Sequence, residues 1–326
     1  METKTDTPLA GALKVGAGVR SVSHVVLALT FLAAATVWGQ QLGVQTDRPT
    51  FKSRIDRVSV SAVVRDQKGR LVMDLQPHDF QVLDGGRPTT IMDFRADRAP
   101  VTLALLMDAS GSMQVSGKDR AARAVADQVL AWLESGKDEV TLLSFDKRLR
   151  ELHGFTSNLE RLSGPLTDVE PWGLTSLHDA IAAAARSVAQ RGRSHRGVVV
   201  LTDGLDTSSR LTPPEVSGIA SSIDVPIYIV TVLSPIDDPE SRTSLVPEGY
   251  GGALRDLADW TGGRLFTSSA PSHSSVAARR IVEELRHQYL LAFEPAGKAG
   301  WHPVEVRVRD RNLTVRARGG YYAGRS

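Results

Sequence analysis

Hydrophobic and polar positions alternate in the segment that begins at Ile55, and this alternation predicts short β-strands. Over residues 58–62, valine and alanine alternate with serine. A period of two is typical of strands with one buried face. Further apolar runs at 71–73, 80–83 and 90–94 are separated by turns rich in Asp and Gly at 66–69 and 84–86. Residues 55–97 are therefore expected to form a β-rich flank of about four strands.

The pattern changes over residues 98–288, where continuous apolar runs alternate with helical stripes. The apolar runs lie at 101–108, 140–145, 197–202, 225–232 and 264–267. Such runs suit strands that are buried on both faces. Between them, apolar residues recur at helical spacing over 119–134, 176–190, 213–222, 254–260 and 274–287. This order predicts an α/β fold, with a doubly wound, mostly parallel sheet and helices on both faces.

Two-residue alternation returns in residues 289–326, with strands expected at 290–293, 304–309 and 313–318. Neither flank alone offers enough strands for a stable sandwich, but together they offer about seven. We therefore expect the two flanks to form one β-sandwich-like body, with the α/β domain inserted between Asp97 and Tyr289. The alternative places each flank separately against the α/β domain.

The N-terminal segment indicates a location outside the cytoplasm. Residues 25–38 form an apolar run, VVLALTFLAAATVW, that is short for a membrane span and typical of a secretory signal. We interpret residues 1–39 as a signal peptide cleaved near Gly39, followed by a linker at 40–54. The alternative is an uncleaved N-terminal anchor, because Val22 could extend the run. Both interpretations make the protein secreted, periplasmic or part of the cell envelope.

Composition and charge exclude several classes of protein. The chain has 326 residues, with 39 Lys and Arg against 37 Asp and Glu, and this near-balance argues against a nucleic-acid binder. It has no cysteine, which excludes disulfides, cysteine-ligated metals and a cysteine nucleophile. Residues 298–325 are basic, and we expect their charges on the solvated face of a hairpin. The alternative is a docking surface for an acidic partner or lipid headgroups.

Oxygen-bearing side chains follow two of the buried runs. Asp108 ends the run at 101–108, and Ser110 and Ser112 come directly after it. Asp203 follows the run at 197–202. Thr175 lies in a loop that leads into the helix at 176–190. The carboxyl ends of parallel strands are where α/β sheets place their ligands. Two carboxylates and three hydroxyls suit Mg²⁺, Mn²⁺ or Ca²⁺, and not zinc or copper.

The combination of D-x-S-x-S at 108–112, Thr175 in GLTSLHDA and Asp203 in LTDG resembles the von Willebrand factor type A domain. The flanks are similar to those of bacterial VWFA-related proteins common in acidobacterial genomes. The resemblance implies a metal-ion-dependent adhesion site in which Ser110, Ser112 and Thr175 ligate the metal through their hydroxyls. It implies that Asp108 and Asp203 bind the metal directly or through water.

Other interpretations of the same residues are weaker. The spacing from Asp108 to Asp119 mimics an EF-hand loop, but Met113 stands where that loop needs glycine. Ser110 or Ser112 with His178 and Asp203 would make a hydrolase triad. The G-x-S-x-G motif is absent, however, and the chain order is not that of α/β-hydrolases. We expect His178 on the exposed side of its helix. A metal-free cluster of polar strand ends remains the plain alternative.

These observations favour a binding module over an enzyme. Two Asp neutralise one divalent cation, and the open coordination position then favours an Asp or Glu from a protein partner. The first alternative is a metal-assisted hydrolase, which would need a general base that we do not find in the loops. The second is a structural envelope protein in which the metal only joins three loops. A membrane contact is expected only through the possible N-terminal anchor.

Overall fold

The computed structural model describes residues 57–192, 195–233, 248–295 and 299–323. The predicted signal peptide or anchor at 1–39 and the linker at 40–54 lie outside the described residues. No helix within the described ranges is long and apolar enough to cross a membrane. The contacts described below all lie within one compact unit of the chain, Ser53–Ser326.

A six-stranded sheet forms the centre of the α/β part, in the order β10-β9-β8-β5-β6-β7. All neighbouring strands are parallel except β6 and β7. The strands are β5 Thr102–Asp108, β6 Glu139–Phe145, β7 Leu149–Thr156, β8 Arg196–Thr202, β9 Ile227–Val232 and β10 Arg264–Ser268. Every residue of β5 is buried, as its continuous apolar run predicts. The predicted mostly parallel sheet is therefore confirmed.

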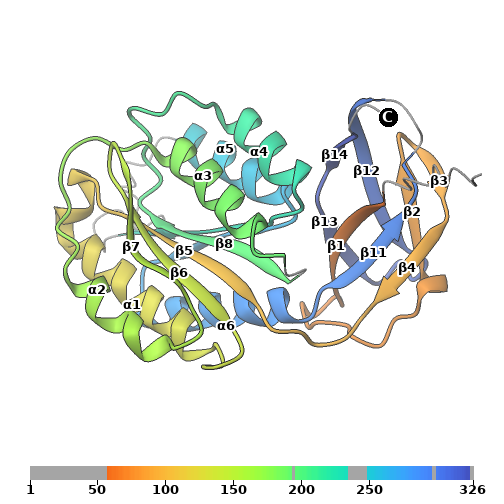
Figure 1. Ribbon diagram of the computed structural model, residues 1–326, viewed down its shortest axis with the longest axis horizontal. Helices are drawn as coiled ribbons and strands as arrows, with labels where there is room; N and C mark the ends of the chain where they lie inside the picture. The colour runs from red at the N-terminus through yellow and green to blue at the C-terminus, as the bar shows by residue number, and fades with distance from the viewer. Residues whose placement is uncertain (1–56, 193–194, 234–247, 296–298, 324–326) are drawn as a thin grey trace, which may run out of the picture. The chain divides into compact units, whose positions relative to one another are not determined.

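Helices cover both faces of this sheet, as predicted (Figure 1). The helices are α1 Lys118–Ala131, α2 Ser163–Thr167, α3 Leu177–Ala189, α4 Pro213–Ser222, α5 Glu248–Trp260 and α6 Pro271–Arg286. Helices α1, α2 and α6 share one hydrophobic core with the sheet, and α3, α4 and α5 share another. The stripe of Ala122, Val125 and Val129 on α1 is buried in the first core.

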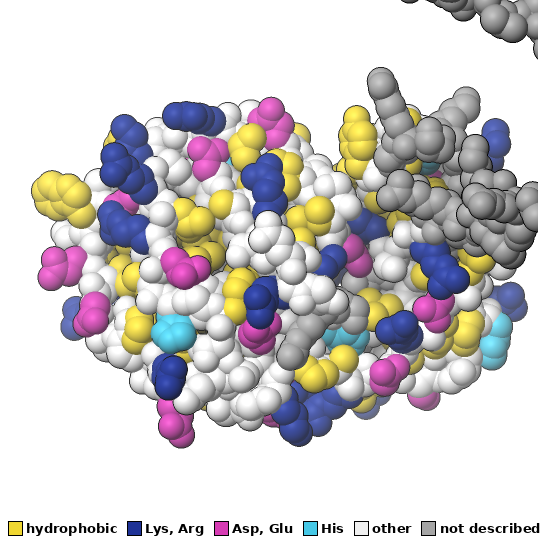
Figure 2. All heavy atoms as spheres, in the orientation of Figure 1, with side chains coloured by type: hydrophobic (Ala, Val, Ile, Leu, Met, Phe, Trp, Pro, Cys, Tyr) yellow, Lys and Arg dark blue, Asp and Glu magenta, His cyan; other side chains and the backbone are white. Residues whose placement is uncertain are grey.

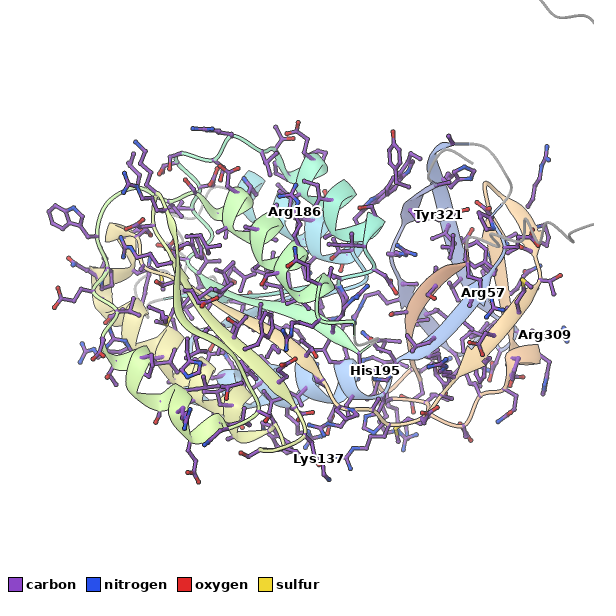
Figure 3. All side chains as sticks on the ribbon, in the orientation of Figure 1. Arg57, Lys137, Arg186, His195, Arg309 and Tyr321 are labelled. Atoms are coloured by element: carbon purple, nitrogen blue, oxygen red, sulfur yellow. The ribbon has the colours of Figure 1, made fainter. Side chains whose placement is uncertain are left out.

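The two flanks build one body of two four-stranded antiparallel sheets, in the orders β13-β1-β11-β4 and β14-β12-β2-β3. The strands are β1 Val58–Arg65, β2 Phe80–Asp84, β3 Arg87–Thr89, β4 Ile91–Arg95, β11 Tyr289–Phe293, β12 Gly300–Val308, β13 Thr314–Ala317 and β14 Gly320–Ala323. Strand β1 pairs with β11 and β13, and β2 pairs with β12, so each sheet contains strands from both flanks. Tyr321 points into this body (Figure 3), where its hydroxyl donates to Asp84 Oδ2 at 2.8 Å. The prediction of a shared β-sandwich-like body is confirmed.

Four strands differ from the expectation. Residues 71–73 form no strand: Leu71 makes only an isolated bridge with Arg65, and Val72 is held by single hydrogen bonds to Val64 and the Tyr289 hydroxyl. Strand β7 was not expected, because it is an edge strand with no fully buried residue and therefore no strong apolar pattern. Strands β3 and β14, also not expected, are too short to show an alternation.

Buried ion pairs connect the sandwich to the α/β part. The Glu284 side chain on α6 is fully buried, and Arg65 Nη2 of β1 lies 2.6 Å from its Oε1. Arg316 of β13 binds the other carboxylate oxygen. Arg318 contacts Asp224, Ser221 and Ser59. The expectation that the C-terminal basic residues are solvated is thus wrong for two arginines. Arg316 and Arg318 form ion pairs with Glu284 and Asp224 of the α/β part. The exposed arginines are Arg307, Arg309 and Arg311.

Removing the central carboxylate should weaken this junction strongly. Glu284→Ala should lower the free energy of unfolding by about 3–5 kcal/mol, because two arginines stay buried without their partner. The adjacent Glu283 pairs with Arg279 where both side chains are partly exposed. Glu283→Ala should therefore cost less than about 1 kcal/mol. Urea unfolding of both variants measures the difference, and equally small losses would contradict a stabilising role for the network.

Candidate metal centre

Asp108 is the last residue of β5 and lies beside the end of β8. The two strands are parallel neighbours, with Met107 opposite Leu201, so their carboxyl ends meet at one edge of the sheet. The Asp108 carboxylate is 1% exposed. It accepts a hydrogen bond from the Thr202 hydroxyl at 2.6 Å and from the Ser110 backbone N–H at 2.8 Å. These two donors stabilise a charged group that water does not reach.

Burial raises the pKa of the Asp108 carboxyl from 3.8 to about 6. The hydrogen bonds from Thr202 and Ser110 act in the opposite direction, and the nearby Asp203 adds to the rise. The folded protein therefore opposes ionisation of Asp108 when no cation is present. A divalent cation beside this carboxylate would remove the penalty.

Ser110 caps the start of the helix η2 Gly111–Gly117, and Ser112 is the second residue of this helix. Their hydroxyl oxygens lie 3.1 Å apart. Ser110 is 1% exposed, and Ser112 is half-buried. Asp108, Ser110 and Ser112 therefore form one cluster of oxygens, as the spacing D-x-S-x-S predicts.

Thr175 is held beside this cluster by backbone contacts of its loop. Trp172 N donates to Ala109 O at 2.7 Å, and Gly111 N donates to Gly173 O at 3.0 Å. The loop turns at Gly173, whose φ of +84° favours glycine. Thr175 itself is 3% exposed, and within the described part of the chain no hydrogen bond engages its hydroxyl. This hydroxyl is available as a ligand.

A third loop, after β8, brings in Asp203. Asp203 is 7% exposed and precedes Gly204, whose φ of +90° is another left-handed turn. Thr207 N and Ser208 N both donate to the carbonyl of Thr175 at 2.9 Å, so this loop and the Thr175 loop are joined. The structure thus places all five predicted residues on three connected loops at one edge of the sheet. His195, just before β8, marks the opposite edge (Figure 3).

Lys118 is a residue of this site that the sequence did not indicate. Its ammonium Nζ lies 3.2 Å from Asp203 Oδ2, and the Asp203 side chain is 1% exposed. Lys118 begins α1, ten positions after Asp108, and nothing in that spacing indicates which loop it faces. The site therefore combines two carboxylates with one fixed positive charge.

The expectation for His178 is wrong. His178 is 8% exposed, and its Nδ1 lies 3.2 Å from Asp206 Oδ2. Asp206 also accepts a hydrogen bond from Leu177 N at 2.8 Å, so one carboxylate fixes both the start of α3 and the imidazole. Within the described residues, no hydrogen bond joins His178 to Ser110 or Ser112. The geometry therefore gives no support to the hydrolase triad.

The donor set fits a hard divalent cation by its chemistry. It offers two carboxylates and three hydroxyls, with no nitrogen or sulfur ligand. The described residues contain no group of three or more His, Cys, Asp or Glu side chains that could hold a metal ion. Any cation at this edge would therefore depend on the serine and threonine hydroxyls as well as on the two carboxylates.

Comparison with known proteins gives a family for this part of the chain. Residues 103–205 match the von Willebrand factor type A domain. This segment runs from β5 to just past Asp203 and contains all five predicted site residues. No curated protein matches the sequence significantly.

Solved structures similar to this chain include three of interest. The conserved hypothetical protein BatB from Bacteroides thetaiotaomicron is 18% identical, with a TM-score of 0.44, over 56% of this chain and 98% of its own. A von Willebrand factor type A protein from Catenulispora acidiphila is 14% identical, with a TM-score of 0.47, over 85% and 76%. Proximal thread matrix protein 1 of the mussel byssus, with a zinc-occupied MIDAS motif, is 18% identical, with a TM-score of 0.47, over 62% and 49%. Residues 103–205, which lie on a mostly parallel sheet with helices on both faces, therefore carry a von Willebrand factor type A match.

Proposed function

We propose that the protein is a metal-dependent protein-binding module. In this proposal Asp108, Ser110, Ser112, Thr175 and Asp203 hold one divalent cation, with Mg²⁺ as the first choice and Mn²⁺ or Ca²⁺ as alternatives. When bound, the cation supplies an open coordination position that accepts an Asp or Glu carboxylate of the partner. The protein is then a binding protein and not an enzyme.

The observation that carries the proposal is the environment of Asp108. Its carboxylate is almost fully buried, and yet its neighbours on the same edge are further oxygens: the Ser110 hydroxyl, the Ser112 hydroxyl and the Asp203 carboxylate. Buried charges in proteins are normally paired or bind metals. A divalent cation would compensate the charge of Asp108 and use the neutral hydroxyls around it.

The charges of the site support an anionic ligand. Asp108 and Asp203 together carry two negative charges. The Lys118 ammonium, 3.2 Å from Asp203 Oδ2, offsets one of them. A divalent cation would therefore leave the site with a net charge of about +1, and not neutral. A cationic site of this kind favours a carboxylate from a partner over a neutral ligand such as water.

The alternative of a metal-assisted hydrolase receives less support. Such an enzyme needs a base that can accept a proton from metal-bound water. His178, the histidine nearest to Thr175 in the sequence, is already paired with Asp206. The second alternative, a structural protein whose metal only joins the loops, predicts metal binding without partner binding, and a partner-binding experiment separates it from our proposal.

We also propose a location outside the cytoplasm, in the cell envelope or secreted. The proposal rests on the sequence pattern of residues 1–39, a basic and polar start followed by the apolar run at 25–38. A protein-binding module with no cysteine suits either compartment. Edman sequencing of the mature protein distinguishes a signal cleaved near Gly39 from an anchor.

Metal binding should stabilise the fold more strongly as the pH rises. Below the pKa of about 6, the cation must displace a proton from Asp108, so the rise in Tm on adding Mg²⁺ should be larger at about pH 7.5 than at about pH 5. Thermal unfolding in Mg²⁺ and in EDTA at both pH values measures this. Identical curves with and without Mg²⁺ at both pH values would contradict a metal site.

Asp108→Asn is the matched variant for the same experiment. In metal-free wild type, the raised pKa means that stability falls as the pH rises from about 4 to about 6. The amide carries no charge, so the variant should gain up to about 3 kcal/mol over metal-free wild type near neutral pH, less the loss of one hydrogen bond. It should also show no response to Mg²⁺. A variant that keeps the Mg²⁺ response would place the cation elsewhere.

Partner binding should depend on the neutral ligand as well as on the carboxylates. Thr175→Ala removes one hydroxyl from a buried loop and should reduce Mg²⁺-dependent capture of the partner from envelope extract by about tenfold or more. Thr314→Ala, at an exposed position of β13, is the control and should bind as wild type does. Calorimetric titration of Thr175→Ala with Mg²⁺ then shows whether this variant has lost metal binding, which would explain the loss of partner capture. Equal capture by Thr175→Ala and wild type, or equal capture in EDTA, would contradict the proposal.

A further inference from the structure

We propose that the face around the metal centre binds an acidic protein segment in which a large apolar side chain lies next to the metal-binding Asp or Glu. This inference rests on the proposed function and specifies the partner. It is carried by two groups of exposed residues. One is the apolar rim, which we define as Val115, Trp172 and Leu174. The other is the basic hairpin, which we define as Lys147, Arg148 and Arg150.

The apolar rim exposes large hydrophobic side chains beside the site. Trp172 is 79% exposed, Val115 is 57% exposed and Leu174 is 51% exposed. Leu174 directly precedes Thr175, and Val115 lies three positions after Ser112. Exposed apolar side chains gathered near one polar site are typical of interaction surfaces, and tryptophan is the residue most often found at binding hot spots.

The loop that carries Trp172 and Leu174 is fixed by hydrogen bonds, so the exposure of Trp172 is not the result of a frayed end. Trp172 N donates to Ala109 O at 2.7 Å. The preceding Pro171 is buried, and its carbonyl accepts a hydrogen bond from Gln114 Nε2 at 2.5 Å. An indole held on an ordered backbone loses little conformational entropy when a partner covers it. This is the arrangement expected of a binding anchor.

The basic hairpin adjoins the apolar rim, because Arg150 and Trp172 line one pocket. Lys147 and Arg148 lie in the turn between β6 and β7, and Arg150 is the second residue of β7. All three are exposed, and Arg150 pairs with Asp146. Ser176 joins it to the Thr175 loop, because Ser176 N donates to Asp146 O at 2.8 Å and the Ser176 hydroxyl donates to Lys147 O at 3.4 Å. Figure 2 shows Lys and Arg side chains beside apolar ones at the left end of the α/β part. Positive charges next to a cationic metal centre complement a partner with more than one acidic residue.

The two groups together orient the partner. The loop at 167–171 contains Asp168 and Glu170, which would repel further acidic residues of the partner. Arg150 lines one pocket with these two acids and pairs with Asp146. The additional acids are therefore expected toward Lys147 and Arg148, and the apolar side chain toward Trp172. A nucleic acid or a lipid headgroup would use the basic hairpin without needing the apolar rim, so the contribution of Trp172 distinguishes these ligands from the protein segment we propose.

A displayed library of random peptides, selected on the full chain in Mg²⁺, tests the inference without a known partner. Enriched peptides should contain Asp or Glu with Phe, Trp, Leu or Ile within about two residues, and they should not be retained in EDTA. A synthetic peptide of the enriched sequence then serves as the probe in fluorescence titrations. Its Glu→Gln version should lose binding, and its apolar→Gly version should bind about tenfold more weakly.

Variants of the chain give the matched comparison. Trp172→Ala should weaken the peptide about tenfold or more while the Tm response to Mg²⁺ stays as in wild type. Trp132→Ala removes an indole that is 43% exposed at the opposite end of α1 and should not change peptide binding. Arg148→Glu should slow association and reduce its salt dependence, whereas Arg309→Glu, in the sandwich, should not.

Failure of this inference is separable from failure of the proposed function. Enriched peptides that need Mg²⁺ and an acidic residue but have no apolar neighbour, and that bind Trp172→Ala as well as wild type, would overturn the inference and leave the proposed function standing. No Mg²⁺-dependent enrichment, or enrichment without acidic residues, would overturn both. Retention of single-stranded DNA or anionic vesicles with no loss in Trp172→Ala would also overturn the inference.

Discussion

The Asp108 carboxylate is a negative charge held out of water at the end of the central strand, and the arrangement of the site follows from it. Burial raises its pKa to about 6, and hydrogen bonds from Thr202 and from the backbone and side chain of Ser110 oppose this effect. The parallel pairing of β5 with β8 fixes where this charge lies, because both strands end at the same edge. Two further loops, joined by the backbone contacts of Thr175, then surround it with oxygens.

A second set of buried charges joins the sandwich to the α/β part. Glu284, on the last helix of the α/β part, pairs with arginines from β1 and β13, which come from opposite ends of the chain. Helix α6 leads directly into β11, and β4 leads into β5, so the inserted domain enters and leaves the sandwich at neighbouring strands. The buried pairs cost desolvation, and they stabilise the junction only while each charge keeps its partner.

The sequence predicted the parts of this molecule that depend on local patterns. The continuous apolar run at 101–108 identified β5, and the stripe on α1 identified its buried face. Asp108, Ser110 and Ser112 were predictable as a cluster because a spacing of two keeps them in one short turn. Edge strand β7 was missed because an exposed strand has no buried face to pattern its residues.

Features that depend on tertiary neighbours were not predictable. His178 is buried because Asp206, 28 positions away, holds its imidazole, and the stripe of its own helix does not reveal that contact. Arg316 and Arg318 alternate as solvated strand residues do, yet they face Glu284 and Asp224 of another body. Lys118 likewise acquires its role from a loop 85 positions away. Long-range ion pairs leave no periodic signal in the sequence.

The central claim is that a divalent cation binds at the carboxyl edge of β5 and β8 through the oxygens of all three loops. Crystals of the protein soaked in Mn²⁺ test it most directly, because anomalous scattering locates the metal independently of the coordinates. Our account predicts one strong peak at bonding distance from the Ser110 and Ser112 hydroxyls, enclosed by Asp108, Thr175 and Asp203, and no peak in Asp108→Asn crystals. A strong peak elsewhere, with the five oxygens unchanged and without a metal between them, would contradict the account.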